Sequence, residues 1–155
     1  MILKTERKAL IGMSTSQERK LEAIQKLLDD LKKELSKGTP VVVEGQKDIE
    51  TLEQLEAIGD IISLKTSGKT TLDVLSEVGN LEKSEVILLL DFDEHGRKWT
   101  NLLTRGLEGI RVKPNLVFWR RLMSLVGRDV KDIEGLSSYI QTLKRRIGKD
   151  IFNVE

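Results

Sequence analysis

Cysteine is absent from this sequence of 155 residues, and only two residues are proline. Without cysteine the chain can form neither a disulfide framework nor a cysteine-ligated zinc site, and thiol catalysis is excluded. The longest unbroken apolar run is Val86–Leu90, far short of the roughly 18–20 residues that cross a bilayer. The first residues, MILKTERKAL, lack the long apolar stretch of a signal peptide. We therefore expect a cytoplasmic protein with no membrane partner.

Charge, in contrast, is abundant, although the net charge is only +1. Residues 1–93 hold 13 Lys and Arg against 18 Asp and Glu, whereas residues 94–155 hold 13 against 7. Eight of the ten arginines lie in this second part. Because the planar donor fork of arginine suits phosphate oxygens, the split favours a polyanion-binding surface, although scattered solvated side chains give the same counts.

The hydrophobic spacing predicts one α/β domain. Apolar residues three and four positions apart indicate helices, and short β-branched runs without alternation indicate strands buried on both faces. The predicted helices are residues 16–37, 48–58, 71–78, 97–107, 116–125 and 133–147, and the predicted strands are residues 41–43, 60–64, 86–90 and 110–112. Strands that alternate with helices imply right-handed crossovers and a parallel sheet.

Acidic residues directly follow two of these predicted strands. Glu44 and Gly45 follow the first strand, and Asp91-Phe92-Asp93 follows the third. Because the carboxyl ends of parallel strands meet at one edge of a sheet, the three carboxylates are expected to lie together. They repel one another unless a cation shares the site, and such oxygen ligands suit Mg²⁺ or Mn²⁺. The alternative is that they are ordinary loop formers and helix caps.

The segments VVVEGQKD and ILLLDFDEHG, some forty residues apart, resemble the two motifs of the Toprim domain. Bacterial-type primases, type IA and II topoisomerases, recombination-repair proteins and small ribosomal-RNA maturase ribonucleases share this domain. The resemblance implies a Rossmann-like sheet of about four parallel strands between helices. It also implies divalent-metal phosphoryl transfer on nucleic acid. In length the chain is most similar to small stand-alone archaeal Toprim proteins, which are related to the maturases.

By this resemblance the Toprim core spans residues 38–113, with helical extensions at residues 1–37 and 114–155. Glu44 is similar to the family glutamate, the general acid or base, which also touches metal, and Asp91 and Asp93 are similar to the metal-binding aspartates. Where topoisomerases carry an acidic residue after the last glycine, this chain has Arg97. The single tyrosine lies in the C-terminal extension and there is no zinc module, so topoisomerase and primase activities are not expected.

Basic residues near the motifs are candidates for phosphate contact. The segment TSGKT, residues 66–70, matches a P-loop only in part, because Ser63 replaces the first glycine of that motif. Gly68 and Lys69 therefore either bind a substrate phosphate beside the carboxylates or form an ordinary turn. The full set of nucleic-acid or phosphate candidates is Lys47, Gly68, Lys69, Arg97, Lys98, Arg111, Arg120 and Arg121.

Two ring side chains in these regions allow two interpretations each. His95, the only histidine, either assists substrate and proton transfer or is simply solvated, and we favour solvation. Trp119 either stacks on a nucleic-acid base or belongs to a buried helix stripe. We favour a core position for Trp119.

The leading functional hypothesis is a maturase-like endoribonuclease that cleaves RNA with Mg²⁺ or Mn²⁺. The alternative is a non-catalytic RNA- or DNA-binding module of a nucleic-acid processing complex. A third possibility is a nucleotide- or phosphate-binding regulator that uses the Gly68 loop. The expected nucleic-acid partner is RNA in preference to DNA. The possible protein partners are a second copy of the chain, in a homodimer, or a protein of a processing complex.

Overall fold

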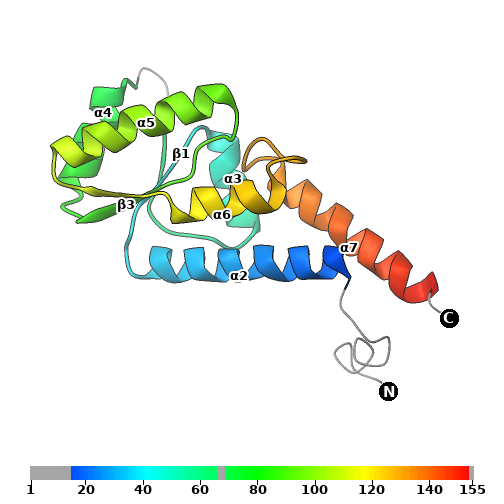
Figure 1. The fold of residues 1–155 in the computed structure, drawn as a ribbon. Coiled ribbons are helices and arrows are strands. Elements are labelled where there is room, and N and C mark those ends of the chain that lie inside the picture. Colours follow the sequence, from blue (N-terminus) through cyan, green and yellow to red (C-terminus); the bar gives the residue numbers. More distant parts are fainter. Residues whose placement is uncertain (1–14, 66–68, 154–155) are drawn as a thin grey trace.

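The computed structural model describes residues 15–65 and 69–153 (Figure 1). The helices are α2 (Ser16–Ser36), α3 (Gln46–Gln54), α4 (Thr71–Asn80), α5 (Glu94–Gly109), α6 (Val117–Val126) and α7 (Leu136–Asn153). The strands are β1 (Val41–Val43), β2 (Ile61–Ser63), β3 (Glu85–Leu88) and β4 (Lys113–Asn115). None of the described helices combines the length and the apolarity that crossing a membrane requires.

The four strands form one parallel sheet in the order β2-β1-β3-β4. Val41 of β1 pairs with Ile61 of β2 on one side and with Ile87 of β3 on the other. The predicted parallel sheet is therefore confirmed. Since β1 and β3 are neighbours at its centre, the loops that follow them lie side by side.

Helices cover both faces of the sheet, as the unalternating apolar strands predicted (Figure 1). Val41, Val43 and Ile87 point into a core shared with α2, α3, α6 and α7. Val42 and Leu88 point to the opposite face, into a second core under α4 and α5. Helix α2 packs against both α6 and α7, and α7 extends beyond the sheet (Figure 1).

The prediction of the fourth strand at residues 110–112 was wrong, because those residues cap the end of α5. Arg111 has a φ of 61°, and the Val112 N–H donates to the Leu107 carbonyl at 2.9 Å. This is the hydrogen bond of a helix end with a left-handed residue. The strand begins only at Lys113 and includes Pro114, which an edge strand tolerates.

Helix α3 also ends earlier than predicted, at Gln54 instead of residue 58. Glu56 adopts a φ of 65°, and the Ala57 N–H donates to the Leu52 carbonyl at 2.8 Å. Ile58, which the helical spacing placed on the buried face, is 69% exposed. Because the left-handed position is not a glycine, no local residue type indicated this helix end.

Candidate metal centre

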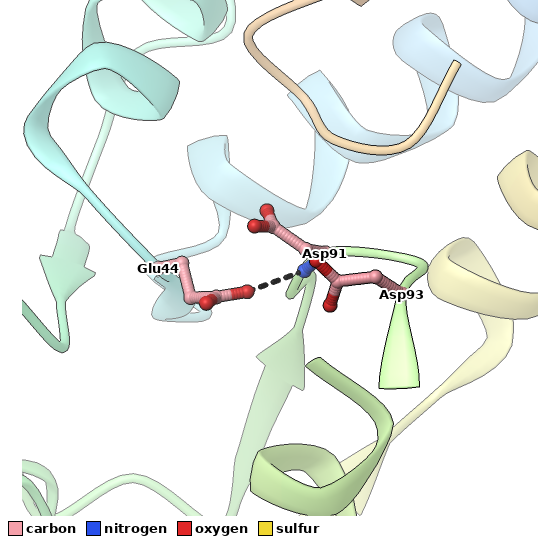
Figure 2. Close-up of side chains that lie close together, drawn as sticks. All are labelled: Glu44, Asp91 and Asp93. Carbon is pink, nitrogen blue, oxygen red and sulfur yellow. Dashed lines mark hydrogen bonds between the residues drawn. The ribbon is translucent and has the colours of Figure 1, made fainter. Parts of the chain in front are cut away.

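Three carboxylates meet at the carboxyl edge of the sheet, as the sequence predicted. Glu44 follows β1 directly, whereas Asp91 and Asp93 lie on the loop that connects β3 to α5 (Figure 2). One oxygen from each side chain lies within 4.8 Å of the other two. Phe92, between the aspartates, is buried in the core, and its N–H donates to the Lys131 carbonyl at 2.7 Å.

Glu44 is held by contacts to both of its carboxylate oxygens, and its side chain is only 3% exposed. Oε2 accepts a hydrogen bond from the Asp91 backbone N–H at 2.9 Å (Figure 2). Oε1 lies 3.4 Å from Nδ1 of His95 and 3.5 Å from Nζ of Lys65. His95 is solvent-exposed, but it is also in contact with the site, which our interpretation of it as merely solvated did not include. Lys65 was not predicted at all.

Asp91 has the features expected of a cation ligand. Its Oδ1 is buried and finds no hydrogen-bond partner among the described residues. Burial, followed by the neighbouring carboxylate of Glu44, raises the pKa of Asp91 to about 8. A buried carboxylate oxygen without a partner is costly, and a divalent cation would remove that cost. The donor set therefore fits a hard divalent metal ion.

Asp93 both caps a helix and faces the site. Its Oδ1 accepts from the Gly96 N–H at 2.7 Å at the start of α5, and the side chain is exposed. The loop turns so tightly that a Cβ on Gly96 would lie 2.1 Å from the Asp91 carbonyl oxygen. Only glycine fits there, so Gly96 sets the path that places both aspartates.

Helix α6 fixes the end of the strand that carries these aspartates. Nε1 of Trp119 donates to the Leu90 carbonyl at 3.0 Å, and the indole packs against the core. The prediction that Trp119 belongs to the core holds in part, because the indole packs against the core but is only partly buried. Its hydrogen bond to the main chain next to Asp91 could not be read from the sequence.

A cavity of about 260 Å³ adjoins the carboxylates. Its wall includes Asp48, which the sequence indicated only as a helix-start residue, and the connection between α6 and α7. Asp48 is buried and accepts hydrogen bonds from the N–H groups of Gly45 and Glu134, both at 3.0 Å. Burial raises its pKa. No sequence pattern predicted that Asp132 and Glu134 return to this edge.

The predicted phosphate-binding residues are not all gathered around the carboxylates. Arg97 and Lys98 are exposed on the first turns of α5, close to Asp93 in the chain. Lys47 lines the cavity, and its Nζ lies 3.7 Å from the Glu134 carboxylate. These three residues lie at the carboxyl edge of the sheet.

The other candidates lie elsewhere or are engaged. Nζ of Lys69 donates to the Ser63 carbonyl at 3.2 Å and lies 3.1 Å from Glu77. Arg120 and Arg121 line a separate groove of about 510 Å³ that also contains residues of α2. Arg111 precedes β4 and so lies at the opposite edge of the parallel sheet. Gly68 lies outside the described residues.

Fold and site together define a class: a parallel Rossmann-like α/β domain with an acidic metal-type cluster at the carboxyl edge of its sheet. The family model of the Toprim domain matches residues 39–116. The chain belongs to the Toprim-domain family. Domains of this family bind divalent metal ions and function with nucleic acid, with which the cluster of Glu44, Asp91 and Asp93 is consistent.

Similar proteins occur in several archaea. The UPF0292 protein of Methanocaldococcus jannaschii is 30% identical over 77% of this chain and 91% of its own length. The UPF0292 protein of Methanosarcina acetivorans is 28% identical over 84% of this chain and 88% of its own length. A solved structure of a protein from Aquifex aeolicus is 27% identical, with a TM-score of 0.60, over 71% of this chain and 94% of that one. The chain is thus similar to small Toprim proteins.

Proposed function

We propose that this protein is a maturase-like endoribonuclease that hydrolyses phosphodiester bonds in RNA with Mg²⁺ or Mn²⁺. The observation that carries the proposal is the carboxylate cluster, in which the oriented Glu44 lies beside a buried, unpartnered oxygen of Asp91. Structural carboxylates of a loop or a cap have no need of such an arrangement. A general acid or base next to a cation site is what phosphodiester cleavage requires.

In this proposal Asp91 and Asp93 would hold the metal ion, and Glu44 would also contact it. When bound, a divalent ion supplies charge neutralisation around the phosphorus and lowers the pKa of water. Oε2 of Glu44 is committed to the Asp91 N–H. We assign to Oε1, whose partners are the exposed side chains of His95 and Lys65 and not the main chain, the proton transfer at the attacking or leaving oxygen.

The basic residues divide into near and distant ones. Arg97, Lys98 and Lys47, at the carboxyl edge of the sheet, would bind the phosphates on either side of the cleaved bond. Gly68 and Lys69 are a second proposed site of contact with a substrate phosphate. Arg120 and Arg121, on α6 beside α2, would guide more remote phosphates. Arg111, at the opposite edge, is too far around the sheet to contact the cleaved bond.

RNA is proposed over DNA because the small archaeal Toprim proteins, which the chain most resembles in length, are related to the maturase ribonucleases. The proposed N-terminal and C-terminal extensions of the Toprim core, residues 1–37 and 114–155, would present the RNA to the sheet edge. A second copy of the chain or a processing-complex protein would extend that surface. The cytoplasm is the proposed location.

The test is cleavage of end-labelled hairpin RNAs, and of DNA hairpins of the same sequence, in Mg²⁺, Mn²⁺ or EDTA. Glu44→Gln keeps the shape of the side chain and is expected to lower the rate by about 10²-fold or more. Asp60→Asn, an exposed carboxylate at the opposite edge of the sheet, is the matched control and should leave the rate unchanged. Full metal-dependent cleavage by Glu44→Gln would contradict the proposal. Metal-independent RNA binding without cleavage would favour the binding-module alternative.

A further inference from the structure

We propose that His95 is a positioning residue for Glu44, a role that deepens the proposed function and rests on it. His95 lies in the first turn of α5, four residues before Trp99, so the two side chains share one face of the helix. Nε1 of Trp99 lies 2.9 Å from Nε2 of His95, and Nδ1 of His95 lies 3.4 Å from Oε1 of Glu44. The imidazole thus bridges an indole and the carboxylate.

The indole fixes which nitrogen of His95 carries the hydrogen. An indole N–H donates and cannot accept, so Nε2 of His95 must be the acceptor. In the neutral imidazole the hydrogen is then on Nδ1, which faces Oε1 of Glu44. The contact with Trp99 therefore makes His95 a donor toward the carboxylate.

The same contacts fix the position of the ring. The rings of His95 and Trp99 meet edge to face, with centroids 5.9 Å apart and an interplanar angle of 71°. Trp99 in turn packs against the core under α4 and α5. The orientation of the imidazole is therefore set by the core, although 62% of the side chain is exposed.

Glu44 has two other partners, and neither replaces His95. The Asp91 N–H holds Oε2 only. Lys65 approaches Oε1 at 3.5 Å, but its side chain is 63% exposed and long, so it confines the carboxylate weakly. Without His95, Oε1 would lose the one hydrogen-bond donor whose position is fixed by packing against Trp99. Partners that orient a metal-binding carboxylate typically contribute about 10–100-fold in metal affinity or activity.

The first test reads the tautomer of the metal-free protein. Because the chain has a single histidine, a long-range proton–nitrogen-15 correlation spectrum contains one imidazole pattern. We expect the Nδ1–H form, and a shift toward the Nε2–H form in Trp99→Phe but not in Asn101→Ala, an exposed control on α5. An Nε2–H form in the unaltered protein, or no change in Trp99→Phe, would overturn the proposal.

The second test compares two amides at position 95. The side-chain NH₂ group of an asparagine at this position would lie near the place of the histidine Nδ1. That of a glutamine would lie near the place of Nε2. His95→Ala is expected to lower Mn²⁺ affinity or kcat about tenfold, His95→Asn to restore most of the loss, and His95→Gln to restore little. Equal values for all three variants would refute the positioning role. The spectrum and the Mn²⁺ affinity do not depend on RNA cleavage, so failure of the proposed function and failure of this role are distinguishable.

Discussion

At the scale of single residues, the environment of Asp91 decides what the site can bind. Its side chain is half-buried beside the carboxylate of Glu44, and its pKa of about 8 lies far above the ordinary 3.8. The position after a buried strand could be predicted from the sequence. The buried and unpartnered Oδ1 could not, because burial at this edge comes from residues distant in the chain, and the α6–α7 connection also lines the cavity beside Asp91.

This raised pKa has a consequence for stability. Between pH 4 and pH 8 the folded protein keeps the proton on Asp91 while the unfolded chain has lost it, so stability falls as pH rises. In EDTA, the unfolding temperature is expected to drop between pH 5 and pH 8, and to drop less in Asp91→Asn. Thermal unfolding followed by circular dichroism at both pH values measures this. Parallel profiles for the two proteins would contradict the account.

At the same scale, the pair of His95 and Trp99 shows where sequence reasoning ends. The predicted helix began only at residue 97 and left His95 in the preceding loop, whereas α5 begins at Glu94 and therefore places both side chains on one helix face. That Nδ1 of His95 reaches Glu44 depends on the pairing of β1 with β3, which brings together residues 51 positions apart. A contact of this range has no local signal.

At the scale of elements, burial explains which strands could be predicted. β1 and β3 are apolar runs covered on both faces, and both were placed correctly within two residues. β4 is short, contains Pro114 and follows a helix end at Arg111 that lacks glycine, so its position was wrong. The predicted end of α3 was wrong because the chain leaves the helix through a left-handed residue, Glu56, that is not glycine.

Trp119 links α6 to the site, so its hydrogen bond is open to test. Trp119→Phe keeps most of the apolar contact but leaves the Leu90 carbonyl without the indole donor. We expect a loss of about 1–2 kcal/mol in the free energy of unfolding. Mn²⁺ affinity should fall as well, because the bond holds the main chain next to Asp91. Chemical denaturation and metal titration give the two values.

Met123→Leu, one turn further along α6 and also packed on the core, is the matched control. It changes packing on α6, and the 3.9 Å contact of Arg97 with the Met123 sulfur, without removing a hydrogen bond to the main chain next to Asp91. If it lowered Mn²⁺ affinity as much as Trp119→Phe, the effect would come from helix packing and not from the indole N–H.

At the scale of the whole molecule, the charge split and the site are connected through α5. The acidic part of the chain ends with Asp93, and the basic part begins on the helix that Asp93 caps. Arg97 and Lys98 therefore stand next to the carboxylates that would bind metal. The basic residues further along the chain are spread over α6, the opposite sheet edge and α7, so the charge count alone did not locate a single surface.

RNA binding through Arg97 and Lys98 should appear in its salt dependence. Replacing both with alanine removes about two phosphate contacts, so the slope of log affinity against log salt should become shallower by about 1–2. Arg105→Ala, an exposed arginine near the far end of the same helix, should leave the slope unchanged. Fluorescence anisotropy with a labelled RNA hairpin in EDTA measures both. An unaltered slope in the double variant would exclude these two residues from the interface.

The central claim, that the carboxylate cluster binds a divalent metal ion, is tested most directly by calorimetric titration of Mn²⁺ into the metal-free protein. The comparison is Asp91→Asn/Asp93→Asn, in which asparagine still caps α5. We predict saturable binding to the unaltered protein and its loss in the double variant. Equal binding by both proteins, or none by the unaltered one, would contradict the claim.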